Sequence, residues 1–249
     1  VTPEGPQIQV SAEECHKKLL QRASDNQTSA DVFGYTPAMM QRFRGTKEGN
    51  NYHVVALLAK SLKNVAEGKV PLAVIFQLCM GKIAGLNKCT AEENEARIKA
   101  GLEPSIRPVN MTTDKLKAAL ATVMDSEEAQ QMKAGLQPIQ MGYGTSAGPE
   151  KVVHRLRAYY DAATHALCVI DACNGLNATL RAALQEAVRA RWKPGMAVFG
   201  AYYGMPSVCL YFYKEDGATI IRVIRGTEGT RMGCIIGGTG FNITVGHFI

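Results

Sequence analysis

Apolar and polar residues alternate with the period of an α-helix in several stretches of the first two thirds of the chain. The clearest is YHVVALLAKSLKNVAE, from Tyr52 to Glu67, which is followed by Gly68, a residue that commonly ends helices. MTTDKLKAALATVM predicts a second helix with a Thr or Asp cap, and GPEKVVHRLRAYYDAATH predicts a third with Pro149 in its first turn. The charged stretch CTAEENEARIKAGLEPS predicts a solvated loop or a short exposed helix.

The first fifty residues have a different pattern. They are polar, contain three prolines and end in the Asn/Gly-rich stretch KEGNN. One helix is expected around residues 12–22. We therefore expect residues 1–50 to form an N-terminal arm.

The last third of the chain combines strand and helix patterns. ALCVID is a short apolar run that ends in Asp171 and predicts a buried strand, and GLNATLRAALQEAVRAR predicts an amphipathic helix directly after it. SVCLYFYKEDGATIIRVIRG predicts two strands joined by a turn at Asp216 and Gly217. This order of elements predicts an α+β fold, with helices packed on a small and mostly antiparallel sheet.

Composition narrows the class of protein. The 249 residues are 46% hydrophobic and 20% charged, which is typical of a globular protein with a sizeable core. The most apolar stretch, VPLAVIFQLCMG, is shorter than the roughly 20 residues that cross a bilayer, so we expect no membrane partner. The net charge of +6 fits a polyanionic partner such as RNA.

The seven cysteines are scattered and form no CxxC pair. They lie mostly inside apolar segments, which favours buried free thiols over a disulfide framework or a zinc site. We therefore expect an intracellular, reducing compartment. His53 and His154 lie on predicted helices with no ligand at metal-binding spacing, so we expect packing or surface roles for both.

Seven stretches, in order, resemble a known family. They look like the fingers and palm of the reverse transcriptase, an RNA-directed DNA polymerase, of a non-LTR retrotransposon of the site-specific type, inserted in ribosomal RNA or spliced-leader genes. The stretches are LLAKSLKNVAEGKVP, GKIAGLNK, IRPVNMTTDKLKAAL, LQPIQMGYGTSAGPEKVVHRLR, VIDACNGLNATLR, YYGMPSVCLYF and GTRMGCIIGG. The resemblance implies a fingers-like helical region over residues 51–165 and a partial palm over residues 166–249.

The resemblance also assigns roles to individual residues. Asp171 matches the first catalytic aspartate, which would hold Mg²⁺ in an active enzyme. Lys88 and Arg107 match basic positions that contact the incoming triphosphate. The Gly-rich segment GTRMGC, which contains Arg231, matches the turn that lets the nucleotide approach closely, so Arg231 is a third candidate for nucleotide or RNA binding.

Departures from the family pattern argue against catalysis. Leu176 occupies the place of an aromatic residue that screens the sugar, and Met232 and Cys234 replace the usual residues of the Gly-rich segment. The second catalytic motif, an aromatic residue, any residue and two aspartates, is not reached before Ile249. The resemblance is therefore to a degenerate reverse transcriptase that is cut before that motif, and one carboxylate cannot organise two metal ions.

Two interpretations follow. We favour an inactive, domesticated protein that binds RNA as a structural part of a large ribonucleoprotein, such as a mitochondrial or other organellar ribosome, with no cofactor and with other chains covering the open palm side. Asp171 would then cap the following helix, while Lys88 and Arg107 would contact the RNA backbone. The alternative is part of an active polymerase that uses Mg²⁺ and whose remaining palm lies beyond Ile249 or on another chain.

Overall fold

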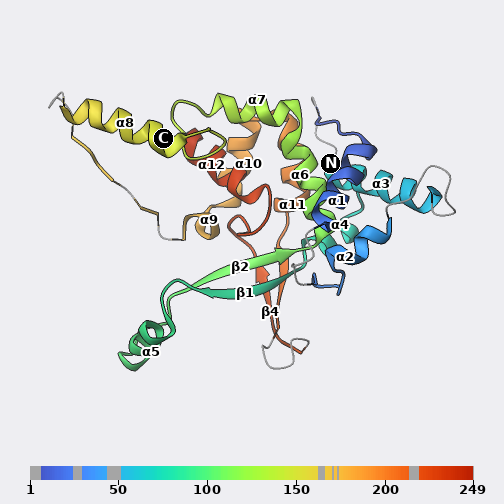
Figure 1. Ribbon diagram of the computed structural model, residues 1–249, viewed down its shortest axis with the longest axis horizontal. Helices are drawn as coiled ribbons and strands as arrows, with labels where there is room; N and C mark the ends of the chain where they lie inside the picture. The colour runs from blue at the N-terminus through green and yellow to red at the C-terminus, as the bar shows by residue number, and fades with distance from the viewer. Residues whose placement is uncertain are drawn as a thin grey trace.

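The computed structural model describes residues 7–24, 30–43, 52–161, 166–169, 171–172, 174–212 and 219–248. Within these ranges, helices surround and extend from one small four-stranded sheet (Figure 1). The predicted α+β class is confirmed. None of the described helices combines the length and the apolar character that a membrane crossing needs.

The N-terminal helices are α1 (Ala12–Ala23), α2 (Pro37–Met40), the short 3₁₀ helix η1 (Gln41–Phe43), α3 (Tyr52–Ala66) and α4 (Leu72–Cys79). Helix α1 starts with a capping box, in which Ser11 and Glu14 each accept a hydrogen bond from the other's backbone N–H. Its apolar side packs against α3 and α6, with Cys15 and Leu19 fully buried. Residues of the expected arm thus contribute to the main core, and the three-part division of the chain stays a prediction.

The middle of the chain contains α5 (Ala91–Lys99), α6 (Asp114–Asp125), α7 (Glu127–Gly135) and α8 (Gly148–Asp161). The Thr113 hydroxyl accepts the Leu116 N–H and begins α6, so of the predicted Thr or Asp cap the structure has the threonine. Of the loop and the short exposed helix that the charged stretch left open, the structure has the helix, α5. Helix α8 has Pro149 in its first turn as expected.

The C-terminal helices are α9 (Gly175–Ala178), α10 (Arg181–Arg191), the 3₁₀ helix η2 (Lys193–Gly195), α11 (Met196–Tyr203) and α12 (Gly237–Phe248). The sequence predicted one continuous helix where the structure has α9 and α10, so this prediction was wrong. The carbonyls of Leu176 and Thr179 accept hydrogen bonds from the N–H groups of Thr230 and Gly229. These carbonyls bond a distant segment instead of a following helical turn, and the backbone is extended at Thr179 and Leu180.

The sheet contains β1 (Gly81–Asn87), β2 (Ile106–Thr112), β3 (Ser207–Phe212) and β4 (Ile220–Gly226), in the order β2-β1-β3-β4. The two outer pairs are antiparallel, whereas the central pair β1 and β3 is parallel. The predicted pairing of β3 with β4 is confirmed, and their turn at Asp216 and Gly217 lies outside the described residues.

The strand predicted for ALCVID is absent from the described part of that stretch. Residues 166–169 lie in no helix or strand and are exposed, and Ile170 lies outside the described residues. An apolar run of this length fits a strand only where a neighbouring strand pairs with its backbone. No described strand does so here.

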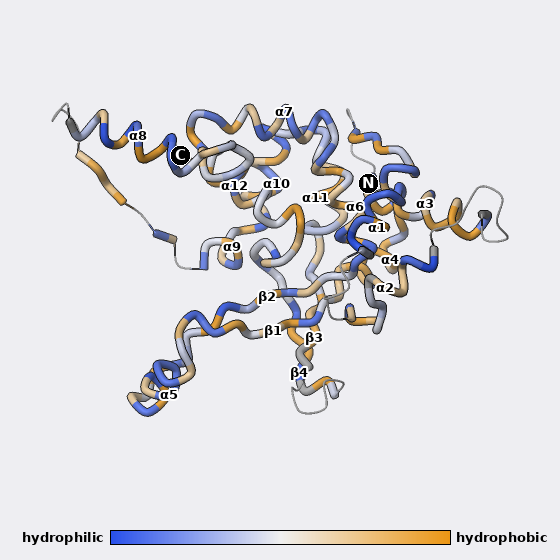
Figure 2. The backbone as a smooth tube through the Cα atoms, in the orientation of Figure 1, coloured by the Kyte–Doolittle hydropathy of each residue, from blue (hydrophilic) through white to orange (hydrophobic). Residues whose placement is uncertain are grey.

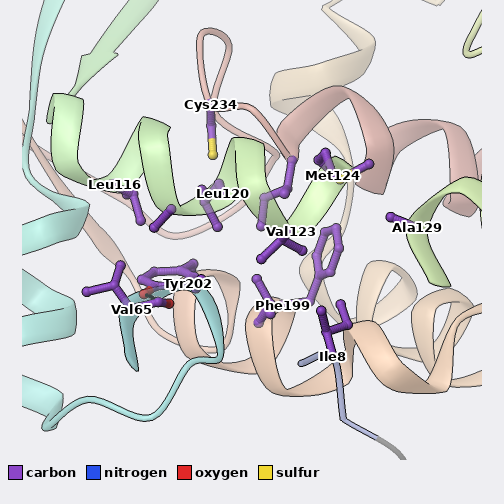
Figure 3. Packing of buried hydrophobic residues seen from close by; sticks show 14 of the residues in the cluster. Ile8, Val65, Leu116, Leu120, Val123, Met124, Ala129, Phe199, Tyr202 and Cys234 are labelled. Atoms are coloured by element: carbon purple, nitrogen blue, oxygen red, sulfur yellow. Dashed lines mark hydrogen bonds between the residues drawn. The ribbon is translucent and has the colours of Figure 1, made fainter. Parts of the chain in front are cut away.

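One hydrophobic cluster joins the helices. Leu116, Leu120 and Val123 of α6 face Phe199 and Tyr202 of α11 across the core (Figure 3). Helix α8 extends from this body with polar and apolar residues alternating along it (Figures 1 and 2). Gly148 is buried, but the side chains of residues 149–160 are all exposed. The hydrophobic core therefore depends little on this helix.

Helix α12 begins with the GGTGFN segment and packs closely against the body. A Cβ atom built on Gly240 would lie 2.7 Å from Cε1 of Phe199 and 2.8 Å from Cδ1 of Leu184. Two residues earlier, a Cβ on Gly238 would meet no atom within 4 Å. The two glycines therefore have different reasons to be glycine.

This difference gives a stability prediction. Gly240→Ala should lower the free energy of unfolding by about 1–3 kcal/mol, because the added methyl overpacks the contact with two buried side chains. Gly238→Ala should raise it by about 0.5–1 kcal/mol, because alanine favours the helix and meets no neighbour. Urea unfolding followed by circular dichroism measures both, and equal effects of the two substitutions would contradict the packing described.

Candidate nucleic-acid interface

The structure brings two of the predicted RNA-contacting residues to one end of the β1–β2 hairpin. Arg107 in β2 pairs across the ladder with Leu86 in β1. Lys88 follows two residues after Leu86, and its N–H donates to the carbonyl of Ser105 at 2.9 Å. Both side chains are exposed. The hairpin extends away from the helical body (Figure 1), so these cations are accessible from solvent.

One face of the sheet collects further basic side chains. Lys82 pairs across with Met111 in β2 and with Leu210 in β3. Since side chains on a strand alternate between faces and directly paired residues share a face, Lys82 and Arg107 lie on the same side of the sheet. Arg225, which pairs with Val208, lies on that side as well. We call the side that carries these three residues the basic sheet face.

The opposite face of the sheet turns toward the helical body. Its residues Gly81, Asn110, Thr112 and Cys209 are buried, and the Asn110 amide lies 3.6 Å from the sulfur of Cys209. The basic sheet face is only half-buried close to the body and is exposed farther along the strands. Only this face is therefore available to a large ligand near the body.

The charges on the strands have one sign. The four described strands contain Lys82, Arg107, Arg222 and Arg225 and no Asp or Glu. Apolar side chains of Leu210, Val223 and their neighbours lie between the cations. Basic groups around apolar surface can contact phosphates and bases at the same time.

Arg231 is placed differently from the other two predicted contacts. It is only 6% exposed, and its Nη1 and Nη2 donate to the carbonyls of Cys79 at 3.1 Å and Tyr202 at 3.3 Å. These carbonyls lie in the last turns of α4 and α11, where helices leave carbonyls without intrahelical partners. In this structure Arg231 therefore joins two helix ends, and its guanidinium is not on the surface that RNA would reach.

A second buried arginine supports the same junction. Arg181, 7% exposed, donates from Nη1 to the carbonyl of Met205 at 2.7 Å and from Nε to that of Gly229 at 3.2 Å. Both guanidinium groups lie near the ring of Tyr203, with that of Arg181 5.6 Å and that of Arg231 5.1 Å from the ring centre. Burial, and then the nearby Arg231 cation, lower the pKa of Arg181.

Asp171 does not cap a helix, so that prediction was wrong. Helix α9 begins at Gly175 and its N-cap is Asn174, which has a left-handed backbone and accepts no side-chain capping bond. Asp171 lies three residues earlier and is exposed. Among the described residues, no ion pair joins this candidate metal ligand to Lys88 or Arg107.

The described residues contain no group of three His, Cys, Asp or Glu side chains that could hold a metal ion. Cys15, Cys79, Cys209 and Cys234 are buried free thiols, as the sequence predicted for most cysteines, whereas Cys168 is exposed. Burial raises the pKa of the Cys79 and Cys209 thiols, which keeps them protonated and unreactive. His53 and His154 lie at the surface.

No protein-family model matches the sequence, and no curated protein matches it. The resemblance to reverse transcriptases stays an interpretation of motifs.

Sequence reasoning missed Lys82, Arg225 and Arg181. Lys82 and Arg225 belong to strands whose pairing decides which side chains share a face, and β1 was not predicted as a strand. Arg181 was hidden within the predicted amphipathic helix, where arginine usually marks the solvent side. A signal for Arg225 was available in IIRVIRG, a predicted strand that carries two arginines and no carboxylate.

The buried position of Arg231 gives a second prediction. Arg231→Met should lower the free energy of unfolding by about 2–4 kcal/mol, because two carbonyls lose a charged donor inside the protein. Arg189→Met, the same change at an exposed position of α10, should change it by no more than about 0.5 kcal/mol. Chemical unfolding of the two variants tests this. Near-equal stabilities would mean that Arg231 does not hold the junction.

Proposed function

We propose that the chain is a domesticated, catalytically inactive protein of reverse-transcriptase type that binds RNA as a structural part of a large ribonucleoprotein, such as an organellar ribosome. The observation that carries the RNA-binding part is the basic sheet face, where Lys82, Arg107 and Arg225 share one open side of strands without a carboxylate. The resemblance of the motifs supports the rest of the proposal. We also propose that this ribonucleoprotein lies in a mitochondrion or another organelle.

The arrangement favours binding with little sequence preference. Cationic side chains contact the phosphates of any RNA. Neutralising these phosphates releases the counterions bound to the RNA, whatever its base sequence. The apolar side chains between them, such as Leu210 and Val223, offer contact surface for bases without hydrogen bonds that would select one. We therefore expect RNA shape and accessibility to decide where the protein binds.

Catalytic inactivity is proposed from the residues at the chemical positions. Leu176 stands in place of the aromatic residue that screens the sugar. Met232 and Cys234 replace the usual residues of the Gly-rich segment. In the proposed assembly, RNA and neighbouring chains would cover the open side of the partial palm.

RNA binding can be tested by fluorescence anisotropy with a labelled single-stranded RNA of mixed sequence. Wild-type affinity should fall steeply with salt, and Arg107→Ala combined with Arg225→Ala should reduce the log–log slope by about 1.4, or 0.7 per lost phosphate contact. Lys60→Ala, which removes an exposed cation from α3, should leave the slope unchanged. A flat salt response of the wild type, or equal effects of all these substitutions, would contradict binding through the basic sheet face.

Inactivity has its own test. Primer extension on an RNA template with Mg²⁺ or Mn²⁺ should give no product with the wild type. Asp171→Asn should leave stability and RNA affinity unchanged, because Asp171 is exposed and caps no helix. Extension by the wild type that the Asn variant abolishes would establish the alternative, an active polymerase with Asp171 as a metal ligand.

A further inference from the structure

Residues 166–169 form an apolar segment that pairs with no strand in the part of the chain that the structure describes. Leu167 and Val169 are 66% and 82% exposed, although leucine and valine are among the residues most often buried in proteins. Within the described chain, no backbone hydrogen bond of a turn, loop or ladder involves these four residues. The composition favours a strand, and the backbone groups are available for pairing.

Strand β4 offers a matching edge. It is the last strand in the described order and pairs only with β3, so its other side lacks a strand neighbour among the described residues. Ile220, Val223 and Ile224 on this strand are all exposed, with Val223 at 60%. An exposed apolar edge strand is a template for pairing with another strand.

The other edge of the sheet is protected. In β2, Pro108 has no N–H to donate, and the N–H of Asn110 already donates to the carbonyl of Met232 at 2.9 Å. The structure thus directs any strand addition to β4.

Charge complementarity identifies the segment that fits this edge. Asp171 is exposed and follows the apolar segment, whereas β4 carries the exposed cations Arg222 and Arg225 and no carboxylate. Within one molecule the segment and β4 are separated by the β1–β2 hairpin in the view of Figure 1. A second copy of the chain can present the segment to β4 without this separation.

We propose that the chain associates with itself by strand addition, with residues 166–169 of one copy pairing along the free edge of β4 of the next and Asp171 lying near Arg222 or Arg225. The donor and acceptor are different surfaces, so the contact is heterologous. Each added copy keeps one free donor and one free acceptor, and the assembly grows into a ring or an open row. Arg225 and Val223 of β4 also belong to the basic sheet face, so self-association is measured in the absence of RNA.

Sedimentation velocity on the full chain, without RNA, tests the proposal. The wild type should form species larger than a dimer as its concentration rises. Val169→Lys blocks the donor and Val223→Lys blocks the acceptor, so each variant alone should remain monomeric or associate about tenfold more weakly. An equal mixture of the two should form a dimer and nothing larger, because only one intact donor and one intact acceptor remain in each pair.

Two further variants distinguish this contact from nonspecific hydrophobic association. Leu156→Lys adds the same charge to an exposed apolar position on α8 and should leave self-association unchanged. Asp171→Arg should weaken association, and adding Arg222→Asp in the same chain should restore it. A wild type that stays monomeric at every concentration, or an assembly that both lysine variants leave intact, would overturn the proposal. So would a monomeric wild type destabilised by Val169→Lys, since the segment would then pair within its own chain.

Discussion

The junction between the helical body and the sheet depends on two buried guanidinium groups. Arg231 donates to carbonyls at the ends of α4 and α11, and β1 and β3, the parallel pair at the centre of the sheet, begin shortly after these two helices. Burying a cation is costly unless its donors are satisfied. Backbone carbonyls accept from Nη1 and Nη2 of Arg231 and the ring of Tyr203 lies beside its guanidinium, while its Nε is buried without a partner among the described residues. The Glu228 carboxylate accepts the backbone N–H of Arg181 at 2.9 Å, but the guanidinium groups themselves donate mainly to backbone carbonyls, so the junction requires the helix ends to be in place.

This constraint has a consequence for the surface. The faces of β1 and β3 that meet the body are fixed by the junction, so alternation along each strand presents Lys82 and its neighbours on the opposite side. The same Gly-rich segment that supplies Arg231 also bonds α9 through Thr230 and β2 through Met232. The segment that resembles a nucleotide-binding turn thus connects helices and sheet in this structure. The RNA contacts that we propose lie instead on the basic sheet face.

The sequence predicted the elements whose local signals are strong. The α3 periodicity, the Thr113 cap, Pro149 in α8 and the β3–β4 pairing appear as expected. The failures share a cause, since each depended on a distant partner. The carbonyls of α9 bond the Gly-rich segment, ALCVID has no described strand beside it, and Arg231 is buried by helices far from it in the chain. At the candidate nucleic-acid interface, the sequence could predict that basic residues take part. Only the strand register shows that Lys82, Arg107 and Arg225 share one face of the sheet.

The central claim is that RNA lies on the basic sheet face of a sheet held by the two buried arginines. Photochemical crosslinking of the protein to RNA, followed by mass spectrometry of the crosslinked peptides, tests it most directly. The account predicts crosslinks on peptides that contain Lys82, Arg107 and Arg225, and none on the peptide that contains Arg231. Crosslinks confined to the helical body, or centred on Arg231, would contradict it.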